Sequence, residues 1–189
     1  MYLISGLIML LQTAISIFIY LFLLRFLLQK LGANYFNQVI QLLVKLTDFA
    51  VKPIRKIIPS FKGYDLGILL IVFVLQIFSV LLLVLFKLPN VAALWGVLII
   101  IIAQIGGKFI NIYFFAIIIQ AIASWIPALQ AGPFIEVVYL ITEPVMKYAR
   151  RWVPPIAGFD LSPIPVLIAL RLIDYIVFNP LLGYGLTQV

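Results

Sequence analysis

The sequence predicts an all-α, polytopic membrane protein with four core spans, formed by two tandem parallel repeats that each carry an interfacial amphipathic helix. Hydrophobic residues make up 66% of the 189 residues and charged residues only 10%. A soluble domain has about 45–50% apolar and about 25% charged residues. Several apolar stretches are long enough to cross a bilayer, and a charged motif occurs twice. These observations exclude a soluble globular fold and a disordered chain.

Four stretches of the chain have the length and composition of membrane spans. A span needs about 20 mostly apolar residues to cross about 30 Å of hydrocarbon. The predicted spans are residues 3–24, 66–86, 109–126 and 164–182. Residues 91–105 are also apolar, but polar residues and two glycines follow at 104–111. We therefore expect 91–105 to form a re-entrant or interfacial segment; a fifth crossing there would move the second basic loop outside.

The basic residues predict the orientation in the membrane. Segment 30–63 holds six Lys or Arg residues, and segment 127–160 holds three. Because positive residues stay on the cytoplasmic side, we expect both segments in the cytoplasm and both termini outside. The first 24 residues contain no Lys or Arg. The positive region of a signal peptide is therefore missing, and the first apolar stretch is expected to stay as a span.

The charged motif reveals an internal repeat with an offset of 95 residues. Ten residues of segment 47–66 have identical or similar partners in segment 142–161, without a gap. Such a repeat is informative before any fold is assigned. The two copies share one orientation, as in transporters whose parallel repeats are related by an axis along the membrane normal. The predicted domains are 1–89 as the first repeat, 90–108 as a re-entrant or interfacial linker, and 109–189 as the second repeat.

A basic amphipathic helix is predicted between the two spans of each repeat. Polar residues recur at steps of three and four from Gln41 to Arg55, while apolar residues fill the remaining positions. The second copy keeps Glu136, Glu143, Lys147 and Arg150 on the same stripe. This pattern is typical of a helix in the interface plane. Thr142-Glu143-Pro144 resembles a helix start. The two helices together carry a basic face made of Lys52, Arg55, Lys56, Lys147, Arg150 and Arg151. This face would bind anionic lipids and control topology, or, alternatively, dock a cytoplasmic protein.

The turn into each second span has the pattern Pro-x-x-x-Gly-aromatic-Asp-Leu. Its key residues are Pro59, Gly63 and Asp65 in the first copy, and Pro154, Gly158 and Asp160 in the second. Proline ends the amphipathic helix, and glycine permits a tight reversal. The aspartate is expected to cap the next helix. The alternative is that the two aspartates are symmetry-related ion ligands.

The duplicated span–amphipathic helix–span unit, with Lys-x-x-Arg-[Lys/Arg] and this turn, resembles the YggT family over about residues 10–182. The closest match to the family pattern is the second turn at 158–163, whereas the first departs from it at Gly67-Ile68. The resemblance implies a bacterial inner-membrane protein with plastid relatives. It implies roles in osmotic-stress tolerance and ion homeostasis, or in the assembly of membrane complexes and division machinery. It implies no catalytic residue.

Polar side chains inside the predicted spans are candidate functional residues. Arg171 and Asp174 lie near the middle of the last span, and Gln76 and Ser79 are their repeat counterparts. Intramembrane charges are often functional, so the four could form a polar path for an ion or small solute. The alternative is a structural contact between helices. Arg25 is expected to extend to the headgroups at the cytoplasmic end of the first span.

Composition excludes much chemistry. The chain has no Cys and no His, which removes Cys/His metal sites and the Ser-His-Asp mechanism. We expect no enzyme, no catalytic residue, no cofactor and no metal. The first hypothesis is support of osmotic tolerance through ion or small-solute movement; the alternative is a non-enzymatic scaffold for membrane complexes or cell division. The expected partners are anionic lipids, further copies of the chain, or a membrane or division protein, and no nucleic acid.

Overall fold

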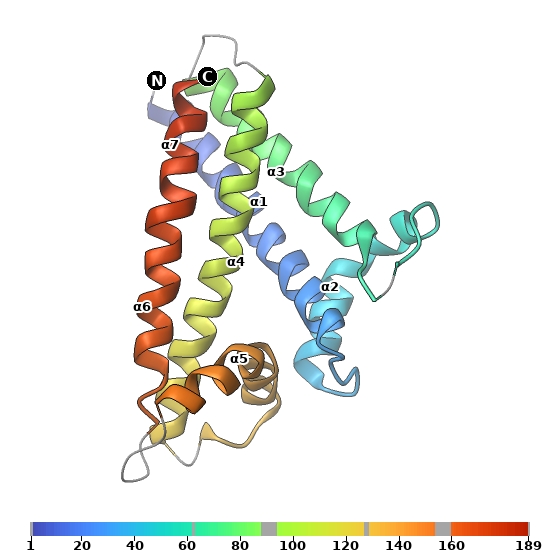
Figure 1. Cartoon of the computed structure of the whole chain (residues 1–189). Coiled ribbons are helices and arrows are strands. Elements are labelled where there is room, and N and C mark those ends of the chain that lie inside the picture. Colours follow the sequence, from blue (N-terminus) through green and yellow to red (C-terminus); the bar gives the residue numbers. More distant parts are fainter. Residues whose placement is uncertain (1, 62, 88–93, 127–128, 154–159, 189) are drawn as a thin grey trace.

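The computed structural model describes residues 2–61, 63–87, 94–126, 129–153 and 160–188, which are helical apart from short connections (Figure 1). This confirms the predicted all-α fold. In chain order the elements are α1 (Tyr2–Lys30), α2 (Gln38–Arg55), α3 (Leu66–Lys87), α4 (Leu94–Trp125), α5 (Pro133–Trp152), α6 (Pro163–Ile173), the π-helical turn η2 (Asp174–Phe178) and α7 (Asn179–Thr187).

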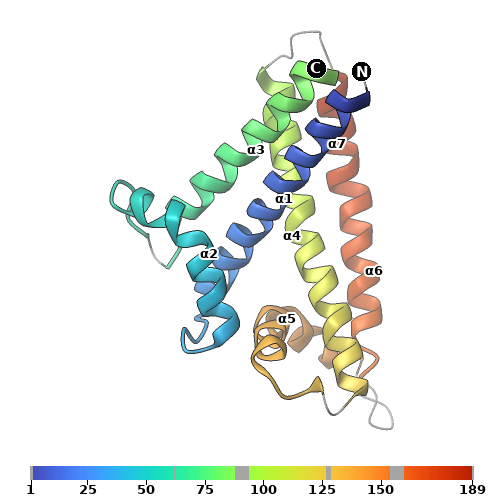
Figure 2. The ribbon, with the colours of Figure 1, turned by 180° about the vertical axis from the view of Figure 1, so that it is seen from behind.

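The two repeats have the same arrangement of helices. In each, a long helix leads to a shorter helix at one end of the molecule, and a second long helix returns (Figures 1 and 2). The returning helix is α3 in the first repeat and the continuous α6–η2–α7 helix in the second. α1 packs against α3, and α4 packs against α7. The start of α1 and the end of α7 therefore lie together, while α2 and α5 share the other end.

Three helices are long and apolar enough to cross a membrane. They are Ser5–Lys30, Leu94–Trp125 and Pro163–Thr187. The apolar helix Leu66–Leu82 is shorter, but it belongs to α3, which runs beside α1 in both views. The composition that predicted membrane insertion thus corresponds to long helices with many exposed apolar side chains, as lipid-facing surfaces require.

α4 differs from the expected re-entrant or interfacial segment at 91–105. Leu94–Trp125 is one helix of 32 residues, about 48 Å long at 1.5 Å per residue. It continues through Gly106 and Gly107, where a break was expected. A Cβ atom on Gly106 would lie only 1.9 Å from a ring carbon of Phe178, so this glycine permits close helix packing. The division of the chain at residues 89 and 108 stays a prediction.

The last long helix contains a local change of geometry. Five residues, Asp174–Phe178, form a π-helical turn between α6 and α7. Such single turns occur mostly inside α-helices and often near functional sites. Here the turn follows Arg171 by three residues and ends at Phe178, the side chain seated against Gly106.

α2 and α5 are amphipathic, as predicted. Their buried sides include Ile40, Leu43 and Val51 in α2, and Val138 and Ile141 in α5. These residues join α1, α3 and α4 in the main hydrophobic core. The helix start expected at 142–144 is wrong, because Pro144 lies inside α5, which begins at Pro133.

Candidate functional site

The first amphipathic helix is attached to α1 by a buried arginine. Arg25 is 6% exposed. One of its nitrogens donates to Thr47 Oγ1 at 2.6 Å and to the Val44 carbonyl at 3.2 Å, and the other lies 2.8 Å from Asp48 Oδ1. The expectation that Arg25 extends to the headgroups is therefore wrong. Its charge is buried with a carboxylate and two further acceptors, the arrangement that a buried cation requires.

Each repeat also has an ion pair between its amphipathic helix and the following span. Arg55 Nε donates to Asp65 Oδ2 at 2.6 Å, and Arg150 Nε donates to Asp160 Oδ2 at 3.0 Å. The Asp65 side chain is fully buried, whereas the Asp160 side chain is 19% exposed. Because these pairs occupy equivalent positions, the repeated Arg and Asp of the motif determine how the chain turns from the amphipathic helix into the span.

Both aspartates also accept hydrogen bonds close to the start of the helix that follows. Asp65 Oδ1 accepts a hydrogen bond from the Ile68 amide at 3.2 Å. Asp160 Oδ1 accepts from the Ser162 amide at 2.9 Å and from its hydroxyl at 2.5 Å. The geometry therefore supports helix capping for Asp65, whereas Asp160 binds Ser162, the residue that precedes α6. In the first turn, Gly63 has a φ of +79°, where glycine is favoured, and Pro59 is exposed. Pro154 and Gly158 lie outside the described residues.

Hydrogen bonds shift the pKa values of charged groups in this region. The hydrogen bond from Lys52, assisted by Arg25, holds the pKa of Asp48 below its usual value despite desolvation. Burial alone would raise the pKa of Asp160, but hydrogen bonds from Ser162 and Arg150 lower it overall. Desolvation would lower the pKa of Arg150, yet Asp160 and Glu143 raise it. All three groups are thus charged near neutral pH.

The predicted basic face separates into two sets of residues. Arg55 and Arg150 are paired with buried or half-buried carboxylates. The other four side chains are exposed, and Lys52 keeps 74% of its side chain exposed even though it pairs with Asp48. We call these four the exposed basic set: Lys52, Lys56, Lys147 and Arg151.

A single asparagine joins the two amphipathic helices. The Asn37 side chain caps α2 through its oxygen, which accepts from the Val39 amide at 2.9 Å. Its Nδ2 donates to the Pro133 carbonyl and to Glu136 Oε2, each at 2.8 Å. One side chain therefore begins α2 and binds the start of α5, which fixes the two repeats relative to each other at this end of the molecule.

The structure does not bring the four predicted intramembrane residues into one site. Gln76 is completely buried and Ser79 is 6% exposed. Gln76 Oε1 accepts from Lys108 Nζ at 3.0 Å, and Gln76 Nε2 donates to Gln104. These contacts join α3 to α4, so this half of the set forms a hydrogen-bonded contact between helices.

Arg171 and Asp174 lie on the other side of α4. The Arg171 guanidinium is 3.9 Å from Asp174 Oδ2 and lies over the Phe114 ring, 3.7 Å from its centroid. One of its nitrogens also donates to Asn111 Oδ1 at 3.4 Å. Nearly half of the Arg171 side chain is exposed. The polar middle of α4 therefore contacts both neighbouring long helices.

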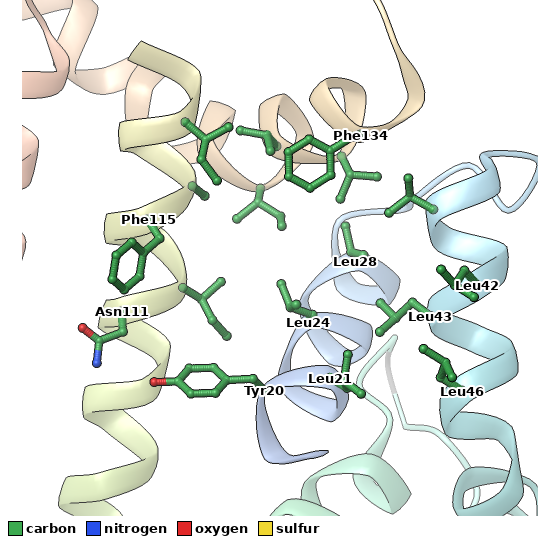
Figure 3. Close-up of a pocket in the computed structure, with 17 residues that line it drawn as sticks. Tyr20, Leu21, Leu24, Leu28, Leu42, Leu43, Leu46, Asn111, Phe115 and Phe134 are labelled. Carbon is green, nitrogen blue, oxygen red and sulfur yellow. The ribbon is translucent and has the colours of Figure 1, made fainter. Parts of the chain in front are cut away.

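A cavity of about 550 Å³ lies between the two repeats (Figure 3). We call it the inter-repeat cavity. α1 and α4 supply its walls, and the apolar sides of α2 and α5 supply the rest. Its polar side chains are Tyr20 and Asn111; the others are hydrocarbon, and those labelled in the figure are Leu21, Leu24, Leu28, Leu42, Leu43, Leu46, Phe115 and Phe134.

Sequence reasoning missed Tyr20, Asn37, Gln104 and Asn111 as structural or site residues. The sequence pattern around Gln104 and Asn111 predicts a break in an apolar tract, although an isolated amide in such a helix also indicates a contact with another helix. Tyr20 had no sequence signal beyond being a hydroxyl within an apolar span. Among the described residues, no three or more carboxylates are grouped to hold a metal ion.

Comparison with known proteins confirms the family resemblance. The CCB3/YggT family model matches residues 4–86 and 99–181, one match for each repeat. Protein PA0392 of Pseudomonas aeruginosa is 35% identical over 172 residues, which cover 90% of this chain and 87% of that protein. YggT of Escherichia coli K12 is 28% identical over 166 residues, covering 87% of this chain and 85% of YggT.

A plastid relative matches a shorter part of the chain. The Arabidopsis thaliana chloroplast protein CCB3, whose name describes cofactor assembly of complex C, is 34% identical over 59 residues, 31% of this chain and 34% of that protein. No solved structure matches the chain significantly. The two family matches and the nearly full-length bacterial relatives agree with the duplicated arrangement of helices. The chain belongs to the CCB3/YggT family.

Proposed function

We propose that the protein is a non-enzymatic scaffold that supports the assembly of a membrane protein complex in the bacterial inner membrane. The observation that carries this proposal is the fixed position of α2 and α5. Ion pairs through Arg25, Arg55 and Arg150 hold the two helices, and Asn37 joins them. A rigid surface with exposed charge is suited to binding, because little ordering is needed when a partner arrives.

The exposed basic set defines the partner chemistry. Lys52, Lys56, Lys147 and Arg151 are exposed at the end of the molecule where α2 and α5 lie. We assign this end to the cytoplasm, with both chain termini outside, by the positive-inside rule. Acidic cytoplasmic segments of a membrane protein complement such a surface. Anionic lipid headgroups complement it too, and the experiment below separates the two.

A relative supports an assembly role. The plastid protein that matches part of this chain is named for cofactor assembly of complex C. We transfer from it only the class of activity, the assembly of a protein complex. The absence of Cys and His from the sequence is compatible with a protein that positions other components and performs no chemistry itself.

Crosslinking tests the scaffold. A photoreactive amino acid at position 52 or 147 should form the same discrete protein adduct in intact cells. Replacing the other three members of the exposed basic set with glutamine should abolish that adduct, and an assembled inner-membrane complex should be lost on native gels. The matched control replaces Lys45, also exposed, and should change neither result. Adducts with lipid alone would contradict the proposal.

Cysteine labelling tests the orientation. The chain contains no cysteine, so Lys56→Cys and Arg151→Cys each give one thiol, one for each repeat. An impermeant maleimide should label both in inverted membrane vesicles and neither in intact spheroplasts. Labelling of the two on opposite sides of the membrane would overturn the proposed orientation and the parallel repeat.

A second candidate function is ion or small-solute movement that supports osmotic tolerance. The polar residues on two sides of α4, Lys108 and Asn111 among them, favour it. We expect a pore of this kind to need several copies of the chain. Liposomes with purified protein should then show ion flux, which Arg171→Leu should reduce without lowering the yield of folded protein. Flux equal to that of empty liposomes would leave the scaffold as the better account.

A further inference from the structure

The inter-repeat cavity contains two polar groups in an otherwise hydrocarbon lining. Tyr20 lines it from α1 and Asn111 from α4, and Figure 3 shows the Tyr20 ring extending from α1 toward α4, with its hydroxyl on the side that faces Asn111. Within the described part of the chain, the Tyr20 hydroxyl has no hydrogen-bond partner. A phenol in apolar surroundings usually finds one, so this donor is available to a molecule in the cavity.

The polar contacts of Asn111 determine what it can offer. Its Oδ1 accepts the hydrogen bond from Arg171 on α6. This contact uses one of the two lone pairs of the amide oxygen and leaves the Nδ2 hydrogens as donors. Tyr20 also supplies a hydroxyl hydrogen. Two donors that line one cavity can bind an acceptor oxygen, and a carbonyl oxygen can accept two hydrogen bonds at once.

We propose that the inter-repeat cavity binds a lipophilic carbonyl compound of the prenylquinone type, taken from the bilayer. A volume of about 550 Å³ lies in the range of roughly 300–1,000 Å³ found for small-molecule sites. The hydrocarbon walls suit a ring and an isoprenoid tail. Tyr20 and Asn111 bind the quinone carbonyl, and Arg171 is a positioning residue that orients the Asn111 amide.

The depth of the donors distinguishes this ligand from a phospholipid. Tyr20 lies ten residues before the end of α1 at Lys30, about 15 Å along the helix. Asn111 lies near the middle of α4. The ester carbonyls and headgroup of a phospholipid lie at the membrane interface. A carbonyl at the depth of Tyr20 belongs to a molecule dissolved in the hydrocarbon, as prenylquinones are.

The end of the cavity formed by the amphipathic helices argues against a transmembrane helix as the occupant. α2 and α5 contact each other there, and Asn37 joins them. A spanning helix, about 10–12 Å wide, needs a path through the whole bilayer. A molecule that ends within the membrane needs no such path.

Fluorescence quenching tests the site. Phe115, which lines the cavity and is 58% exposed, is replaced by Trp as a reporter in full-length protein in nanodiscs. Decylubiquinone, a quinone with a ten-carbon tail, is the probe. Quenching should be saturable after subtraction of the parent signal. The matched control, Phe78→Trp, is 52% exposed on α3 outside the cavity and should show only collisional, non-saturating quenching.

Two further variants separate recognition of the carbonyl from general partitioning. Tyr20→Phe keeps the ring and should weaken the apparent affinity about 2- to 12-fold, the range for one hydrogen bond. Arg171→Leu should weaken it as well. Decylbenzene, which has the tail but no carbonyl, should compete poorly with decylubiquinone. This weak competition should be the same in the parent protein and in Tyr20→Phe. Unchanged thermal unfolding of Tyr20→Phe shows that the fold is intact.

Three results would overturn the inference. The first is quenching that fails to saturate in the Phe115→Trp protein. The second is equal affinity for decylubiquinone in the parent and in Tyr20→Phe, or equal competition by decylbenzene, since either means a nonspecific apolar site. The third is native mass spectrometry that finds phospholipid in the cavity which decylubiquinone does not displace. None of these results bears on the scaffold, whose test concerns the exposed basic set.

Discussion

The two repeats have the same order of helices, but their amphipathic helices are attached to the rest of the protein by different contacts. In the first, Arg25 on α1 binds Thr47 and Asp48 on α2. The equivalent residue of the second repeat is Gln120, which is 2% exposed and whose Oε1 has no hydrogen-bond partner among the described residues. Glu143, the counterpart of Asp48, pairs with Arg150 instead.

This comparison shows which contacts are common to both copies and which differ between them. Both copies retain the pair between the arginine near the end of the amphipathic helix and the turn aspartate, because it determines the turn into the next span. Among the described residues, the arginine contact with the first span of the repeat is present only in the first copy. α2 is therefore attached at its middle by Arg25 and at its last residue by Arg55, whereas α5 depends on Arg150 and on Asn37 from the other repeat.

The largest expected effect comes from making the first repeat like the second. Arg25→Gln removes the buried partner of Asp48, and breaking a buried ion pair typically costs about 3–5 kcal/mol. We expect a loss near the lower end, since the Asp48 side chain is 22% exposed. Denaturant unfolding in detergent measures it. Lys52→Gln, which removes the exposed partner of the same aspartate, should cost below about 1 kcal/mol; equal losses would contradict the structure.

The next effect compares the two turn aspartates, Asp65 and Asp160. Asp65→Asn should destabilise the protein by about 2–3 kcal/mol, because a buried charged hydrogen bond is lost and Arg55 loses its carboxylate. Asp160→Asn should cost about 1 kcal/mol less, since its side chain is 19% exposed while that of Asp65 is fully buried. Thermal unfolding of the two variants in the same detergent provides the measurement. A larger loss for Asp160→Asn would reverse the order that burial predicts.

Acid should weaken the second turn in a predictable direction. The pKa of Asp160 is lower in the folded protein than its ordinary value of 3.8. The stabilisation is thus fully present above the unfolded pKa and is lost as the pH falls through the folded pKa. Melting temperatures measured from about pH 6 to about pH 3 should fall more steeply for the parent than for Asp160→Asn. Parallel curves would show that this carboxylate contributes nothing to the acid response.

Much of the fold, but less of the site, could be predicted from the sequence. The repeat, the amphipathic helices and the turn aspartates follow from local spacing. The partners of Arg25 and Asn37 do not, because they lie on elements 19 to 99 residues away. The continuity of α4 depends on Gly106 fitting Phe178. From the local sequence alone, Gly106 predicts a break in the helix. The contact that explains it, with the distant Phe178 ring, cannot be predicted from local sequence.

The four intramembrane polar residues show the same limit. Repeat symmetry places Gln76 and Arg171 at equivalent positions, and composition alone suggests one shared site. The structure separates them because α4 lies between their helices and presents different polar residues to each, Lys108 to α3 and Asn111 to α6. Residues at equivalent positions in the two repeats therefore need not contact each other, because each of them packs against different neighbouring residues.

The smallest expected effect concerns the buried glutamine of the second repeat. Gln120→Leu replaces an amide whose Oε1 has no described partner with an apolar group of similar size. Removing an unsatisfied buried acceptor should be neutral or stabilising by about 1 kcal/mol. The matched control is Gln76→Leu: Gln76 is equally buried but bonds to Gln104 and Lys108, so its loss should destabilise the protein. If thermal unfolding showed equal destabilisation by both variants, Gln120 would have a partner as important as those of Gln76, and the contrast between the two repeats would disappear.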